Sequence, residues 1–245
     1  MTSANTVRKI TILKNSLQDF LVTHHFAWRP KLKRAKACNV QSFLNAWVYT
    51  IGHSNHEIET FINLLISHNI SAVCDVRSAP YSRYAPQFNY EAIREKLRQK
   101  GIQYVYLGKE LGPRSDDPDC YKDGKVEYER LAKTDIFQEG LKRVNKGVQS
   151  FRVALMCAEK DPANCHRTIL VCRHLRSADL EILHILEDGS LENNRDLERR
   201  LMRMLKIPDQ TLFDSPEDLV EQAYNEQGKR IAYKISDEND NSGGD

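Results

Sequence analysis

Residues that could carry out chemistry occur in short segments directly after stretches with the composition of buried β-strands. His53 follows one such stretch, Cys157 follows another, and Cys165-His166-Arg167 opens a predicted helix. In open parallel sheets, ligands bind beyond the carboxyl ends of the strands. We therefore expect one site built from the polar side chains at these ends, namely His53, Ser54, Asp75, Arg77, Ser78, Lys109, Glu110, Cys157, Glu159, Cys165, His166 and Arg167.

The Cys165-His166-Arg167 segment predicts thiol chemistry on an anionic substrate. A thiol in the first turn of a helix ionises easily, because free amides and the helix dipole stabilise the thiolate. His166 can move a proton near neutral pH, and Arg167 offers planar forked donors to a phosphate or carboxylate. The resulting hypothesis is an enzyme, a hydrolase or a transferase, that acts on an anionic small molecule or a nucleotide.

This hypothesis gives each residue a role. The nucleophile is Cys165 or Cys157, the acid or base is His166 or His53, and the carboxylate that orients the histidine is Asp75 or Glu159. Substrate binding falls to Ser54, Arg77, Arg83 and Arg167. A structural interpretation of the same residues stays open, in which Cys165 merely starts a helix, His166 is solvated and Arg167 pairs with Glu159.

Metal binding is a second chemical hypothesis. Cys157, Cys165 and His166, joined by Cys74 or His53, would supply soft ligands. The spacing between Cys157 and Cys165 is not that of a zinc finger, so the sequence does not assign a metal site. It names no cofactor and no oligomeric state either.

Nucleic-acid binding or processing is a third hypothesis. The loop 81–88 combines Tyr81, Arg83, Tyr84 and Phe88, a composition that can stack a base and hold a backbone phosphate. The same composition also suits a loop that only packs over a sheet. Gly52-His53-Ser54 has one glycine, so a phosphate-binding dinucleotide fingerprint is absent.

These residues depend on an alternation of strand-like and helix-like segments. Strands are predicted at 48–51, 70–76, 102–107, 151–156 and 180–186, with helices at about 58–65, 89–100, 126–145 and 165–175 between them. Strands separated by helices pair in parallel through right-handed crossovers. The sequence therefore predicts an α/β fold with a mainly parallel sheet flanked by helices.

Composition divides the chain further. Residues 1–46 contain eight of the 36 Lys and Arg residues and one of the 34 acids, which leaves 28 basic and 33 acidic side chains elsewhere. We expect this basic extension to be poorly ordered or to reflect an upstream start codon. An α/β domain over 47–189, a helical appendage over 190–236 and a polar, disordered tail over 237–245 complete the organisation.

The remaining composition narrows the class of protein. The hydrophobic fraction of 40% and the charged fraction of 29% are ordinary for a globular protein. No apolar run approaches the roughly 20 residues of a membrane span, so no membrane partner is expected. Six cysteines in a chain of this length indicate free thiols in a reducing compartment.

Four motifs resemble one known family. Tyr49-Thr50-Ile51-Gly52-His53-Ser54-Asn55, Asp75-Val76-Arg77-Ser78-Ala79-Pro80-Tyr81-Ser82-Arg83, Pro86-Gln87-Phe88, and Cys157-Ala158-Glu159-Lys160-Asp161-Pro162 leading to Cys165-His166-Arg167 occur in order. They resemble the domain-of-unknown-function family 488 in its longer form. The resemblance implies a Rossmann-like α/β fold and a cytoplasmic protein, and it marks His53, Ser54, Asp75, Arg77, Arg83, Cys157, Glu159, Cys165, His166 and Arg167 as motif residues. It implies no activity.

Overall fold

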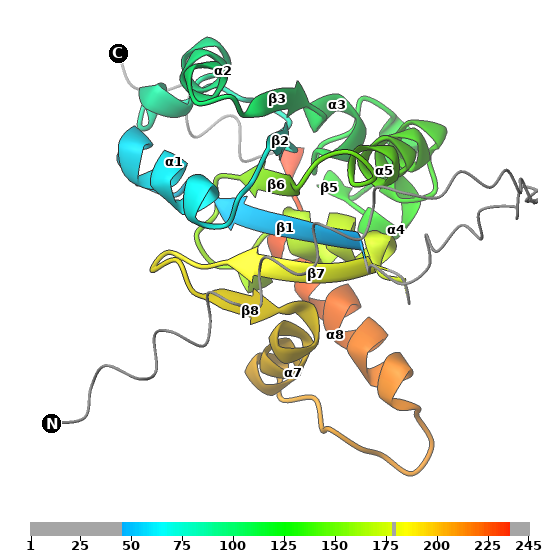
Figure 1. Cartoon of the computed structure of the whole chain (residues 1–245). Helices are drawn as coiled ribbons and strands as arrows, with labels where there is room; N and C mark the ends of the chain where they lie inside the picture. The colour runs from blue at the N-terminus through cyan, green and yellow to red at the C-terminus, as the bar shows by residue number, and fades with distance from the viewer. Residues whose placement is uncertain (1–45, 178–179, 236–245) are drawn as a thin grey trace, which may run out of the picture. The chain divides into compact units, whose positions relative to one another are not determined.

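The computed structural model describes residues 46–177 and 180–235. The expected basic extension, apart from its last residue, and the expected polar tail lie outside these residues. The described part is built on a mainly parallel sheet of six strands in the order β3-β2-β6-β1-β7-β8, as Figure 1 shows. The strands are β1 (Ala46–Gly52), β2 (Ala72–Asp75), β3 (Gln103–Tyr106), β6 (Val153–Cys157), β7 (Leu180–Ile185) and β8 (Leu191–Asn193). This arrangement confirms the predicted α/β fold.

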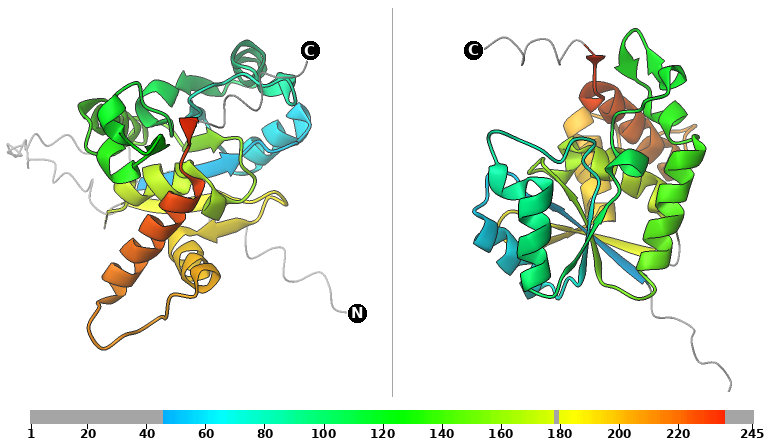
Figure 2. Two further views of the ribbon diagram at one scale, coloured as in Figure 1. Left: turned by 180° about the vertical axis from the view of Figure 1, so that it is seen from behind. Right: turned by 90° about the horizontal axis from the view of Figure 1, so that it is seen from above.

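The helices cover both faces of the sheet. Successive residues of β1 serve opposite faces: Val48 packs into one hydrophobic cluster, while Tyr49 and Ile51 pack into the other. The second cluster lies under α1 (Ile58–Ser67) and α2 (Tyr90–Gln99). The first lies under α5 (Asp135–Gly147), the π-helical segment η4 (Arg167–Cys172) and α8 (Pro216–Ile231). The view along the sheet in Figure 2 shows α1 and α2 on one side and α5 on the other.

Short elements connect these layers. They are the 3-10 turns η1 (Pro86–Phe88), η2 (Pro118–Cys120) and η3 (Pro162–Asn164), the helices α3 (Gly108–Leu111), α4 (Tyr128–Leu131), α6 (Arg173–Leu175) and α7 (Asn194–Leu205), and a hairpin of β4 (Tyr121–Lys122) and β5 (Lys125–Val126). The structure differs from the sequence prediction at three places. Residues 108–125, between the predicted strand at 102–107 and the predicted helix at 126–145, contribute to the hairpin, and that predicted helix is two helices, α4 and α5.

The third difference lies after Gly189, where the appendage over 190–236 was expected to be helical. The chain first adds β8 antiparallel to β7, and only then begins α7. Gly189 adopts φ +84°, which lets the chain reverse within a tight turn. The Asn193 side chain then accepts a hydrogen bond from the Asp196 amide and starts α7. A three-residue strand carries too little alternation for a sequence pattern to show it.

The C-terminal helices form part of the same layered structure. The described residues, 46–177 and 180–235, belong to one compact unit, within which α8 packs against η4 and α7 packs against α8 and β7. Tyr224 of α8 is fully buried, and its hydroxyl donates to Glu198 of α7. Among the described helices, none is long and apolar enough to cross a membrane.

Candidate functional site

Cys157, Cys165 and His166 form a compact, buried cluster. Cys157 is the last residue of β6, and the chain returns through η3 to bring Cys165 and His166 beside it. His166 Nδ1 lies 3.5 Å from the Cys157 sulfur and 3.9 Å from the Cys165 sulfur. The three side-chain atoms all lie within 4.8 Å of one another. The predicted convergence of these residues is therefore present in the fold, whereas Cys74 and His53 do not belong to the cluster.

The ring of His166 is fixed by the main chain. Its Nε2 lies 2.9 Å from the carbonyl oxygen of Val76, which follows β2. A carbonyl can only accept a hydrogen bond, so Nε2 carries a proton and Nδ1 is the nitrogen that can present a lone pair. That lone pair faces both sulfurs. The neighbouring strand β2 thus decides which nitrogen of His166 can react or bind.

The two thiols share one ionisation. The hydrogen bond to Cys165, together with burial, raises the pKa of Cys157 well above its usual value. Burial opposes a thiolate at Cys165 as well, yet the hydrogen bond from Cys157, the charge of Arg167 and the contact with His166 lower its pKa well below the usual value. The pair therefore holds a single negative charge more easily than an isolated buried thiol would.

Arg167 lies beneath this cluster and is fully buried. Nη1 donates to the Glu159 carbonyl oxygen at 2.6 Å, and Nη2 donates to the Lys160 carbonyl oxygen at 3.2 Å. Nε lies 3.4 Å from Thr50 Oγ1 on β1. Arg167 therefore contacts Glu159 through its main chain, and not through the carboxylate that the structural interpretation predicted. These donors hold the loop after β6, and Arg167, which was expected to bind substrate, does not line the cavity described below.

Arg77, Asp75 and His53 form a second buried group at the ends of β2 and β1. Arg77 Nε and Nη2 donate to the Asp75 carboxylate at 2.9 Å and 2.6 Å, and Nη2 also donates to the Phe88 carbonyl oxygen. Nη1 lies 3.1 Å from His53 Nε2, and Tyr104 donates to Asp75 at 2.7 Å. Four of the five N–H donors of Arg77 are thus engaged within the protein.

A cavity of about 510 Å³ joins the cluster to solvent. Cys157, His166 and Arg77 line it, whereas Cys165 lies behind them and is fully buried. Glu159 also lines it, and burial together with the neighbouring Cys165 raises the pKa of the Glu159 carboxyl. Several of the motif side chains therefore face one solvent-open cavity beyond the carboxyl ends of β2 and β6.

The C-terminal segment closes the opposite wall of this cavity. Arg230, Ile231, Ala232 and Tyr233 line it from the end of α8 onward, and Arg114 joins them with its guanidinium 4.2 Å from the Tyr233 ring centroid. Sequence reasoning missed these residues. No local pattern marks them, because they reach the cavity only through the packing of α8 on η4.

Some expected site residues lie elsewhere. Ser54 donates to Asn55 Oδ1 and does not line the cavity. Arg83 is exposed in the loop after β2, and Glu110 forms an ion pair with Arg143 on α5. Neither contributes to the cavity wall, and neither does Lys109. The sequence analysis expected these residues to belong to the site, but the fold does not bring them to the cavity.

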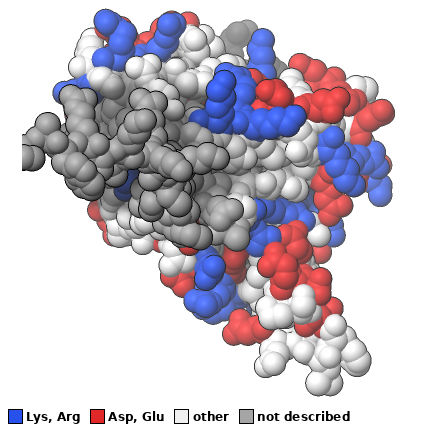
Figure 3. All heavy atoms as spheres, turned by 45° about the vertical axis from the view of Figure 1, so that its right-hand side comes forward, with Lys and Arg blue, Asp and Glu red and all other residues white. Residues whose placement is uncertain are grey.

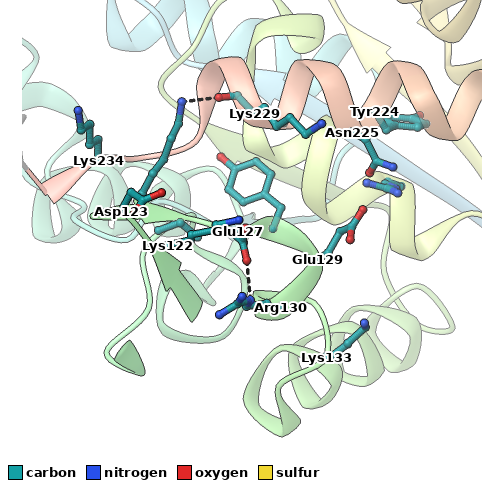
Figure 4. A pocket seen from close by; sticks show the side chains of 15 residues that line it. Lys122, Asp123, Glu127, Glu129, Arg130, Lys133, Tyr224, Asn225, Lys229 and Lys234 are labelled. Atoms are coloured by element: carbon teal, nitrogen blue, oxygen red, sulfur yellow. Dashed lines mark hydrogen bonds and ion pairs between the residues drawn. The ribbon is translucent and has the colours of Figure 1, made fainter. Parts of the chain in front are cut away.

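A larger cavity of about 880 Å³ lies on the other side of the C-terminal segment. Figure 4 shows it between α8 and the region of α4, with basic side chains around its rim, among them Lys122, Lys133 and Lys234. Tyr128 lines both cavities. The larger cavity contains no cysteine, histidine or motif residue, so we place the chemistry in the smaller one. Over the face in Figure 3, basic and acidic side chains lie intermixed.

Comparison with known proteins agrees with the motifs. Residues 57–173 match the family model described as domain of unknown function DUF488. The match includes Asp75, Arg77 and the whole Cys157–Arg167 segment, and it ends before α7 and α8. No curated protein and no solved structure matches the chain. The resemblance stated from the motifs is therefore confirmed over residues 57–173, a segment that contains β2, β3, β6 and the thiol–imidazole cluster and matches the DUF488 family model.

Proposed function

We propose that this protein is an enzyme, a hydrolase or a transferase, that acts on a small anionic substrate bound in the 510 Å³ cavity. One observation carries the proposal: Cys157 and His166 line the same cavity as three arginines, Arg77, Arg114 and Arg230. A reactive centre and an anion-binding wall in one cavity are what such a reaction requires.

The arginines divide the task of binding. Arg77 is held by Asp75, His53 and Phe88, so it offers the substrate one remaining donor and a fixed orientation. Arg230 is exposed at the rim, where its flexible side chain can close on an anion. Arg77 thus positions the anion, and the exposed Arg114 and Arg230 supply the charge that attracts it.

Glu159 is placed for proton transfer. Its side chain is exposed on the wall that Cys157 also lines, and partial desolvation together with the neighbouring Cys165 raises its pKa, which favours a carboxyl that can gain and lose a proton during a reaction. Cys157 and His166 of the thiol–imidazole cluster line the same cavity, where an attacking thiolate or an activated water would meet the substrate. We assign proton transfer to Glu159 and not to His53, which faces Arg77.

Ligand binding tests the proposal first. The full chain is screened by thermal shift and calorimetry against inorganic phosphate, sugar phosphates and nucleotides, since a ligand of the folded state raises the melting temperature. We expect one anion class to stabilise the parent, and Arg230→Gln to weaken that binding. Lys229→Gln is the matched control, because Lys229 precedes Arg230 but lines only the larger cavity.

A turnover assay tests the catalytic part of the proposal. The anion that binds is incubated with the protein, and its conversion is followed by mass spectrometry. Glu159→Gln is expected to bind the anion normally while its turnover falls about a hundredfold or more. If no anion stabilises the parent, or if Lys229→Gln weakens binding while Arg230→Gln does not, the assignment of the substrate to this cavity is wrong.

A second candidate function is binding of a nucleic-acid strand through the loop after β2. Tyr84 is 90% exposed and Tyr81 is 59% exposed, an unusual state for two aromatic side chains beside an arginine, Arg83. Fluorescence anisotropy with a short labelled single strand tests it. Binding that falls steeply with salt and is lost in Tyr84→Ser would support this function, whereas unchanged binding in that variant would remove it.

A further inference from the structure

The distances within the thiol–imidazole cluster match those of a metal centre. With metal–sulfur bonds of about 2.3 Å, metal–nitrogen bonds of about 2.0 Å and tetrahedral angles, a sulfur and a nitrogen ligand lie about 3.5 Å apart. His166 Nδ1 lies 3.5 Å and 3.9 Å from the sulfurs of Cys157 and Cys165. We propose that these three side chains bind a zinc ion, and this inference deepens the proposed function, on which its catalytic role rests.

The orientation of His166 is the one that a metal ligand needs. A histidine that binds a metal through one nitrogen usually donates its other N–H to a carbonyl or a carboxylate, which fixes the ring and raises its basicity. The Val76 carbonyl oxygen takes this position, 2.9 Å from Nε2. The lone pair of Nδ1 therefore points between the two sulfurs without any rearrangement of the fold.

The burial and the chemical type of the three side chains also favour a zinc site. The exposed fractions of Cys157, Cys165 and His166 are 5%, 0% and 6%, so all three ligands are shielded from bulk water. Two thiolates and one imidazole are soft ligands suited to zinc. Two negative sulfurs and a divalent ion form a neutral centre, which costs less to bury than an isolated thiolate would.

The ligand number points to a catalytic site. Structural zinc sites have four protein ligands, whereas catalytic sites have three and keep one position for water or substrate. In the described part of the chain, no fourth His, Cys, Asp or Glu belongs to the cluster. Because Cys157 and His166 line the 510 Å³ cavity, the fourth position faces the space where we place the anion.

A zinc ion in this position would change the role of the sulfurs from nucleophiles to ligands. Zinc lowers the pKa of a bound water enough to form a hydroxide near neutral pH. In the hydrolytic step, the water proton passes to Glu159 and the oxygen bonds to the electrophilic atom of the substrate. The leaving group then departs with its bonding electrons and takes the proton from Glu159. No atom changes its oxidation state in this hydrolysis, so the reaction needs no redox partner.

Elemental analysis of the full chain tests the inference. The protein is produced in zinc-supplemented medium, purified with a phosphine reductant and without chelator, and analysed by mass spectrometry for metals. We expect about one zinc per chain. Cys157→Ser, Cys165→Ser and His166→Ala are expected to lose it. Cys172→Ser is the matched control, because Cys172 is a fully buried cysteine of η4 outside the cluster.

A second measurement does not depend on the variants folding. Cobalt added to the parent after chelator treatment is expected to give sulfur-to-metal charge-transfer absorption and the strong visible bands of tetrahedral coordination. Substoichiometric zinc in the parent together with an octahedral cobalt spectrum would overturn the metal site. Retention of zinc in folded Cys165→Ser and His166→Ala would overturn it as well.

The experiments distinguish a failure of the metal site from a failure of the proposed function. Anion binding that depends on Arg230 in a protein without metal would leave the cavity as the substrate site and remove only the zinc. Stoichiometric zinc held by the cluster, with no anion bound in any assay, would keep the metal site and remove the proposed substrate class.

Discussion

Arg77 links the ends of two strands through His53: its Nη1 lies 3.1 Å from His53 Nε2. His53 Nδ1 donates to the Ser54 carbonyl oxygen, so Nε2 carries the lone pair that accepts from the guanidinium. Burial, and then the charge of Arg77, lower the pKa of His53 to about 4. His53 is thus a neutral acceptor that positions Arg77 at the cavity.

The ion pair between Arg77 and Asp75 makes this group sensitive to substitution. Asp75 is fully buried, so Arg77→Met strands its carboxylate and is expected to lower the free energy of unfolding by about 3–5 kcal/mol. Denaturant titration measures the change. The double variant Asp75→Asn/Arg77→Met should lose less than Arg77→Met alone, because no charge is then stranded. Equal or additive losses would contradict a coupled pair.

Arg167 is expected to matter for stability more than for ligand affinity. Arg167→Leu leaves the carbonyl groups of Glu159 and Lys160 without their buried donor, which should cost about 2–4 kcal/mol in denaturant titration. Arg199→Leu serves as the control, since its ion pair with Asp196 is exposed and should contribute less than about 1 kcal/mol. A change in Arg167→Leu as small as the control would show that the loop after β6 does not depend on this guanidinium.

Because His184 is buried, we expect the protein to lose stability in mild acid. It is buried between Thr50 and Asn194, and burial, with the charge of Arg167, lowers its pKa from 6.5 to about 3. Between these values the unfolded chain binds a proton that the folded chain does not, so stability falls as pH drops below 6.5. From pH 7 to pH 5 this one residue should remove about 2 kcal/mol. Denaturant titration at both pH values should show a smaller loss in His184→Gln; an identical loss would exclude His184 as its source.

Gly52 permits the loop after β6 to reach the end of β1. A Cβ at this position would lie 1.9 Å from the Glu159 carbonyl oxygen, a main-chain atom that cannot rotate away. Gly52→Ala should therefore destabilise the protein by about 3 kcal/mol and displace Glu159. In Gly147→Ala the new Cβ meets nothing nearer than 3.7 Å at the end of α5, and a small gain of about 0.5 kcal/mol is expected. Thermal unfolding of the two variants distinguishes them.

The sequence by itself determined the layered α/β fold and three members of the cluster. Alternating strand and helix patterns require parallel pairing, and parallel pairing brings the residues after each strand to one edge of the sheet. That rule was sufficient to gather Cys157, Cys165 and His166. Pairing β2 with β6 then placed the Val76 carbonyl against His166, a contact across 90 positions that no local pattern contains.

Only the tertiary structure decided which groups each charged side chain contacts. Arg77 and Arg167 have the same chemistry and both occur in motif segments, yet Arg77 lines the cavity while Arg167 is buried against carbonyl groups. Arg230 reaches the cavity from a helix outside the matched family segment. The physical reason is that sequence patterns report local conformation and which face is buried, whereas the partner of a charge depends on how separate elements pack together.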